Sequence, residues 1–258
     1  RGVYPTEIDE DTAYTIGLGF GSYIRSIGKE KCVVGHDNRL SSDSLYSALI
    51  QGIKETGINI ISLGLCTTPM YYYACIKLKV FSGVMVTASH NPKDDNGFKF
   101  AFDEAGNCKG QEIQDFLEFI LKGEFSNGEG HVSNYDITND YIELFKNNIN
   151  FGKRRIKVVV DPGNGTTAVI VKKIYDLFPM DIVYINDDSD GTFPNHHPDP
   201  CVEDNLAQLK AKVKEVGADV GVSFDGDGDR LGVVTGKGQF IPTDIYMPVG
   251  EKSDKIVK

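Results

Sequence analysis

The 258-residue sequence lacks any apolar run that approaches membrane-spanning length, and it has no excess of positive charge. It carries 27 Lys and Arg against 37 Asp and Glu, a formal net charge of -10. An acidic chain is a poor candidate for general attraction to nucleic acid or an anionic membrane. A phosphorylated substrate stays possible, because it needs only a local cationic pocket. We therefore expect no nucleic acid and no membrane among the partners.

Cysteine is also scarce, and its 5 residues form no CxxC motif and no cluster with histidine. An odd number without such spacing is typical of reduced, structural thiols in the cytoplasm. No signal peptide is visible, although the sequence begins at Arg1 rather than at methionine. We therefore expect a cytoplasmic protein.

Apolar runs with strand character alternate with segments of helical periodicity along the whole chain. The order strand, helix, strand, helix, strand, polar loop, strand occurs in residues 1–150 and again in 151–258. This alternation favours largely parallel sheets with helices on their faces. We predict an α/β fold with two similar domains, 1–150 and 151–258, each a mostly parallel mixed sheet flanked by helices. The expected strands are 31–35, 58–63, 82–87, 97–102, 156–161, 181–185, 219–224 and 231–235.

The segments between these strands carry helix and loop signals. Ser41, Ser42 or Asp43 is a suitable N-cap for the helix that contains the apolar stripe from Leu45 to Ile53. Residues 123–136 have three glycines and little apolar content, so we expect a loop there. The other expected helices are 11–27, one that starts at 67–69, 110–122, 137–148, one that follows the turn 162–165 and runs through 178, and 203–216.

Three carboxylates follow strand 219–224, in residues 225–230 (DGDGDR). The intervening glycines let the backbone bend so that the aspartates converge. Carboxylate oxygens suit Mg²⁺, Mn²⁺ or Ca²⁺ rather than Zn²⁺. An EF-hand is excluded, because Arg230 and Gly236 stand where that loop needs Gly and Glu. We predict a divalent-cation site with Arg230 beside it to bind a phosphate; an acidic surface turn is the alternative. The predicted metal ligands are Asp225, Asp227 and Asp229.

A second polar loop, residues 87–92 (TASHNP), follows strand 82–87. Pro92 disfavours helix and so presents Ser89 at a strand end, where α/β proteins bind ligands. By itself Ser89 can equally be a turn residue that bonds its own backbone. A Ser-His-Asp hydrolase is disfavoured, because the GxSxG elbow of many such enzymes is absent.

Several other polar residues have both a functional and a structural interpretation. The Asn96-Gly97 turn brings Lys99 back near Ser89, where its ammonium could balance phosphate charge; a solvated strand lysine is the alternative. His90 can likewise be a satisfied structural histidine, and Arg39 a member of a surface ion pair. For two further segments the structural interpretation is favoured: the proline-flanked His196, His197 and Asp199, and the GNG turn at 163–165.

Taken together, four segments resemble the α-D-phosphohexomutase family, the phosphoglucomutase/phosphomannomutase enzymes. They are TASHNP with DDNGFK (87–99), VVVDPGNG (158–165), FPNHHPDP (193–200) and SFDGDGDR (223–230). The resemblance implies that a phosphoserine donates its phosphoryl group to a hexose monophosphate, and that the resulting hexose 1,6-bisphosphate reorients and returns the other phosphate. Hexose phosphates are the implied partners and Mg²⁺ the implied cofactor.

The resemblance also implies roles for particular residues. Ser89 would be the phosphoserine, and an oxygen of its phosphate would be a fourth metal ligand beside the three aspartates. The other residues that would line the site and handle charge or protons are Arg1, His90, Lys99, Arg230 and, as a weaker member, Arg39.

The sequence departs from the family in three ways. His36 stands where members commonly have Arg, and Asp95 where many have Tyr. Members also have four domains, of which the third and fourth recognise the sugar and its distal phosphate, whereas this sequence stops at Lys258. We therefore expect a two-domain fragment with poor or absent turnover. The alternatives are a non-catalytic metal- and phosphate-binding module and a metal-dependent sugar phosphohydrolase.

Overall fold

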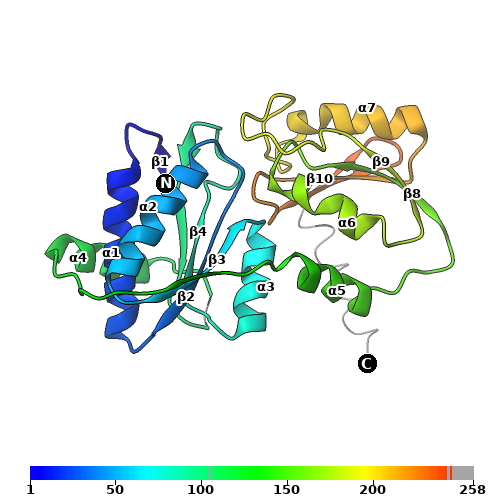
Figure 1. The fold of residues 1–258 in the computed structure, drawn as a ribbon. Coiled ribbons are helices and arrows are strands. Elements are labelled where there is room, and N and C mark those ends of the chain that lie inside the picture. The colour runs from blue at the N-terminus through cyan, green and yellow to red at the C-terminus, as the bar shows by residue number, and fades with distance from the viewer. Residues whose placement is uncertain (105, 243–244, 246–258) are drawn as a thin grey trace. The chain divides into compact units, whose positions relative to one another are not determined.

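A computed structural model describes residues 1–104, 106–242 and 245 (Figure 1). It divides into two compact units, the first from Arg1 to Tyr141 and the second beginning at Ile142. The division lies inside helix α5 (Thr138–Asn148). The sequence places the boundary after residue 150, because a helix that runs across the junction leaves no change of composition to mark it.

The first unit contains a five-stranded sheet in the order β6-β4-β2-β3-β7. Its three central strands and β7 are parallel, and β6 runs antiparallel to β4. A short antiparallel ribbon joins β1 to β5. The strands are β1 (Gly2–Val3), β2 (Lys31–His36), β3 (Asn59–Leu65), β4 (Gly83–Val86), β5 (Asp95–Asn96), β6 (Phe98–Ala101) and β7 (Val132–Asn134).

Helices cover both faces of this sheet. Helices α1 (Glu10–Ser26) and α2 (Ser42–Glu55) lie on one face and α3 (Thr68–Leu78) on the other (Figure 1). Helix α4 (Gln111–Lys122) packs against α1. Aromatic rings fill the space between α1, α4 and β6, with centroids 5.9 Å apart for Phe20 and Phe100 and 5.0 Å apart for Phe100 and Phe116.

The second unit contains a sheet in the order β12-β11-β10-β8-β9, in which β10, β8 and β9 are parallel. Alternate residues of β8 enter the cores on its two faces: Val159 packs with Leu209 of α7, and Val160 packs with Val171 of α6. The elements are β8 (Ile156–Asp161), the 3₁₀ helix η1 (Thr166–Val169), α6 (Val171–Tyr175), β9 (Met180–Tyr184), η2 (Glu203–Leu206), α7 (Ala207–Val216), β10 (Val220–Phe224), β11 (Leu231–Thr235) and β12 (Phe240–Ile241).

The two units share one topology. Strands β6-β4-β2-β3 of the first correspond in order and direction to β11-β10-β8-β9 of the second. In both, the third parallel strand, β4 or β10, runs into a polar loop and the chain returns antiparallel. The predicted fold of two similar α/β domains is confirmed.

Two local expectations were wrong, and a third was confirmed only in position. Residues 123–136 include β7, a strand of only three residues whose pairing with β3 outweighs its weak pattern. The helix expected after 162–165 divides into η1 and α6. Ser41 is the N-cap residue of α2, but its side chain makes no capping hydrogen bond, and its Oγ accepts one from Asn96 Nδ2.

Across the described residues, no helix combines the length and apolar character that a membrane crossing requires. The longest of the helices named above, α1, has 17 residues and carries three charged side chains, Glu10, Asp11 and Arg25.

Helices α1 and α2 approach each other closely at two glycines. A Cβ on Gly17 would lie 2.3 Å from the carbonyl oxygen of Leu49, and a Cβ on Gly52 would lie 2.2 Å from that of Tyr14. Real Cβ atoms do not reach such distances, so any side chain at these positions forces the helices apart.

We predict that Gly52→Ala destabilises the first unit. In an exposed helix this change adds about 1 kcal/mol of stability, but here overpacking should cost about 2 kcal/mol net. Urea unfolding followed by circular dichroism measures it. The neighbouring exposed Gln51→Ala is the control and should change the unfolding free energy by less than about 0.5 kcal/mol. A Gly52→Ala protein as stable as the parent would contradict the close helix contact.

Candidate active-site loops

Ser89 lies in the loop that follows β4, and its backbone is in the left-handed region with φ 57. The residue is 1% exposed, and its N–H donates to Thr87 Oγ1 over 2.8 Å. A non-glycine residue adopts this conformation only when its surroundings hold it there, and such residues cluster at functional sites. The conformation of this loop is therefore imposed by specific contacts, and the loop is a candidate functional segment.

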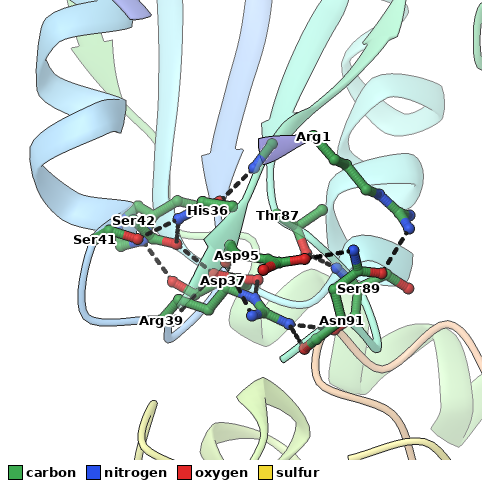
Figure 2. A network of polar contacts seen from close by, with 12 residues as sticks. Arg1, His36, Asp37, Arg39, Ser41, Ser42, Thr87, Ser89, Asn91 and Asp95 are labelled. Carbon is green, nitrogen blue, oxygen red and sulfur yellow. Dashed lines mark hydrogen bonds and ion pairs between the residues drawn. The ribbon is translucent and has the colours of Figure 1, made fainter. Parts of the chain in front are cut away.

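The surroundings that hold this loop centre on the buried side chain of Arg39, which is 2% exposed. Figure 2 shows its guanidinium between the loop after β2 and the loop after β4. Its Nε donates to Asp37 Oδ2 over 3.2 Å. Nη1 and Nη2 donate to four carbonyl oxygens, in the serine loop and at the start of β5, so all five N–H donors are used. The four carbonyls belong to Ser89, Asn91, Pro92 and Asp95.

This geometry assigns Arg39 a structural task that the sequence did not reveal. A guanidinium whose Nη1 and Nη2 donate to backbone carbonyls and whose Nε donates to Asp37 shapes the loop instead of offering a fork to a phosphate. The role of Arg39 as a residue that lines a catalytic site stays a prediction, and the contacts favour positioning.

Asp37 completes the anchor and was missed by sequence reasoning. Its carboxylate is 1% exposed, accepts from the Arg39 N–H over 3.1 Å, and accepts from the Ser42 hydroxyl. Burial raises the pKa of Asp37, and the Arg39 charge and these hydrogen bonds oppose that rise. A usable signal was present: a carboxylate two residues before an arginine, directly after a buried strand.

The remaining predicted residues of the first unit occupy neighbouring elements. Arg1 Nη1 donates to Asn91 Oδ1 over 3.0 Å, and its stem lies over Gly97, where an added Cβ would be 2.8 Å from its Cγ. Lys99 stands on β6 opposite Met85 of β4, so the predicted return of the chain after Gly97 is confirmed. His90 follows Ser89 and is half-buried. The structure thus brings Arg1, Arg39 and the serine loop together.

The aspartate loop of the second unit follows β10, and its three carboxylates converge as predicted. One oxygen from each of them lies within 4.8 Å of the others. Asp225 and Asp227 are fully buried and Asp229 is exposed. The turn closes through the Gly228 N–H, which donates to the Asp225 carbonyl over 3.1 Å, with Gly228 at φ 79.

The electrostatics of this loop fit a hard divalent cation. Burial, reinforced by the charges of Asp227 and Asp229, raises the pKa of the Asp225 carboxyl well above its ordinary value. Crowded buried carboxylates are costly alone and become favourable when a cation neutralises them. The three oxygen donors suit Mg²⁺ or Mn²⁺ and leave coordination positions for water or a phosphate oxygen. Within the described residues, this is the one cluster of potential metal ligands.

Arg230 follows the aspartates and is half-buried. Its N–H donates to Asp225 Oδ1 over 3.0 Å, so the residue helps to close the loop through its backbone. The contact of its guanidinium with a phosphate stays a prediction.

Fold and loops together define a two-domain α/β protein with a strained serine loop and a carboxylate loop for a divalent cation. Residues 1–127 match the family described as phosphoglucomutase/phosphomannomutase, alpha/beta/alpha domain I, and residues 139–238 match its alpha/beta/alpha domain II. The chain belongs to the phosphoglucomutase/phosphomannomutase family, as the four sequence motifs indicated.

Individual relatives agree with this assignment. A phosphomannomutase/phosphoglucomutase of Pseudomonas syringae pv. tomato is 42% identical over 95% of this chain and 52% of that protein. A phosphoglucomutase of Neisseria meningitidis serogroup A is 37% identical over 95% of this chain and 53% of its own length. The solved structure of a phosphoglucomutase/phosphomannomutase family protein from Burkholderia thailandensis has a TM-score of 0.88 at 39% identity, over 93% of this chain and 54% of that chain. The chain thus spans about half the length of these relatives.

We predict that Arg39→Met lowers the unfolding free energy by about 3–5 kcal/mol, because it leaves Asp37 as an unpaired buried carboxylate. Urea unfolding measures the loss. Adding Asp37→Asn to Arg39→Met should recover part of it, since the buried charge is then gone. A double variant less stable than Arg39→Met by the full cost of Asp37→Asn alone would contradict the pairing.

A second prediction concerns Asp227→Asn. Without metal this variant should be more stable than the parent, because it relieves the repulsion among the carboxylates. It should also lose stabilisation by Mn²⁺, which in the parent reaches about 2.7 kcal/mol at a hundredfold excess over Kd. Thermal unfolding with and without Mn²⁺ tests both effects, and the exposed Asp204→Asn serves as the control. Equal stabilisation of Asp227→Asn and the parent would remove the aspartates as ligands.

Proposed function

We propose that this chain carries the phosphoryl-transfer half of a phosphohexomutase, an isomerase that interconverts hexose 1-phosphate and hexose 6-phosphate. Ser89 would be the phosphoserine, and Asp225, Asp227 and Asp229 would hold Mg²⁺. The observation that carries the proposal is the strained, buried Ser89, whose loop is held by hydrogen bonds from Nη1 and Nη2 of Arg39. Membership of a family whose relatives are named as mutases supports it.

In the forward step, the phosphorus–oxygen bond to Ser89 Oγ breaks and a bond forms to the free hydroxyl of the hexose monophosphate. The sugar hydroxyl proton moves to a base, for which His90 and Lys99 are the candidates, and Ser89 Oγ takes up a proton as it leaves the phosphorus. The hexose 1,6-bisphosphate then returns its other phosphoryl group to Ser89. When bound, Mg²⁺ supplies charge neutralisation to the phosphoryl group, one of whose oxygens would be a further ligand.

Positive side chains complete the proposed charge balance. Arg1, which the structure places beside Asn91 of the serine loop, and Arg230 would bind the anionic oxygens. Arg39 would act earlier, by giving Ser89 the backbone conformation from which its hydroxyl is presented. We infer that the hexose is selected by segments that the longer relatives have in addition to the part matched here. Turnover by the 258 residues alone should therefore be poor. We place this chemistry in the cytoplasm.

Mass spectrometry of the intact protein tests the proposal. After incubation with a hexose 1,6-bisphosphate and Mg²⁺, we expect one added phosphoryl group, mapped by peptide analysis to Ser89. Ser89→Ala should add none, while Ser41→Ala, a neighbouring buried serine outside the loop, should load normally. A protein that stays unmodified even when extended to the length of its relatives would refute the phosphoserine role.

The same samples separate the two alternatives. A metal-dependent sugar phosphohydrolase would release inorganic phosphate in proportion to the substrate consumed. A non-catalytic binding module would bind Mn²⁺ and sugar phosphate without any modification of Ser89. Stable loading with little free phosphate is the result that only the mutase chemistry predicts.

A further inference from the structure

A second buried ion pair lies in the second unit, between His196 and Asp161. Nε2 of His196 lies 3.0 Å from Oδ2 of Asp161, which is fully buried at the end of β8. Nδ1 lies 3.0 Å from the carbonyl oxygen of His197. Because both ring nitrogens face acceptors, only the protonated imidazole can donate from both. Burial lowers the pKa of His196 but the contact with Asp161 raises it, with a net rise.

The other oxygen of Asp161 holds the turn at 162–165. Its Oδ1 accepts from the Gly163 N–H over 2.9 Å and from Asn186 Nδ2 over 3.1 Å. The His196 ring also lies on this turn, since a Cβ on Gly163 would be 3.2 Å from its Cε1. The turn has positive φ at two successive residues, 59 at Gly163 and 58 at Asn164. Its unusual backbone thus depends on the ion pair.

The 162–165 turn lies directly against the aspartate loop. The Thr166 N–H donates to the carbonyl oxygen of Gly226 over 2.8 Å. A Cβ on Gly165 would lie 3.0 Å from that oxygen and 3.1 Å from the carbonyl oxygen of Asp225. Gly226 stands between Asp225 and Asp227, so its position sets how those two carboxylates approach each other.

We propose that His196, paired with Asp161, is a positioning residue for the aspartate loop: it holds the 162–165 turn against Gly226 and thereby sets the spacing of the three carboxylates. Cation affinity then depends on a side chain that is itself no ligand. The inference rests on the proposed function only in taking the aspartate loop as the metal site. It gives the proline-flanked 193–200 loop a task that its sequence did not reveal.

Titration of the purified chain with Mn²⁺, with free ion measured by electron paramagnetic resonance, tests the proposal. His196→Ala should weaken Mn²⁺ binding about tenfold, the low end of the loss that follows removal of outer-shell partners. His196→Gln, which keeps a donor toward Asp161, should recover part of that affinity. Gly165→Ala should weaken binding independently, because its methyl group displaces the turn from Gly226.

Two controls separate a positioning role from general destabilisation. Val213→Ala removes buried apolar volume from α7, where Val213 packs against Gly221 near the start of β10, and should lower stability without changing Mn²⁺ affinity. Asp227→Asn should abolish binding. If His196→Ala and Gly165→Ala both bind Mn²⁺ as tightly as the parent while Asp227→Asn does not bind it, this inference is overturned. The assignment of the aspartates as metal ligands would then still stand. A parent chain that binds no Mn²⁺ overturns both.

Discussion

The organisation of both loops depends on one constraint: a charge buried in a protein must be paired, and its hydrogen-bonding capacity must be used. In the first unit, Asp37 and Arg39 form a buried ion pair, and the guanidinium also donates hydrogen bonds to carbonyl oxygens of the serine loop. In the second unit, Asp161 pairs with His196 and accepts a hydrogen bond from the Gly163 N–H, in the turn beside the aspartate loop. Each of the two loops therefore lies beside an ion pair that belongs to the scaffold.

The two loops differ in their electrostatics. The Arg39 anchor leaves the serine loop with its carbonyls satisfied and Ser89 in a conformation that an isolated peptide avoids. The aspartate loop instead gathers carboxylates: Asp225 and Asp227 are buried close to each other and to Asp229, and burial together with the neighbouring charges raises the pKa of Asp225. Hydrogen bonds from one buried arginine thus hold the serine loop, whereas the aspartate loop gathers three carboxylates that could bind a cation.

The repeated topology explains how one sheet design carries two different loops. In each unit the loop follows the third parallel strand, β4 or β10, and an antiparallel strand then returns beside it. A parallel strand that ends at a sheet edge presents backbone and side chains outward at a fixed place. The loop sequence can then change without altering the sheet, and TASHNP and DGDGDR are two such loops on one frame.

Much of this protein was determined by local sequence. The period of apolar residues specified the strands and most helices, since burial of one face leaves few alternatives, and the DGDGDR spacing alone brought three carboxylates together within one turn. Tertiary structure decided what depends on residues distant in the chain. The pairing of β7 with β3, the hydrogen bonds from Nη1 and Nη2 of Arg39 to carbonyls fifty or more residues away, and the contact of His196 with Asp161 have no local signal. Such contacts form only when folding excludes water and leaves each buried donor one acceptor within reach.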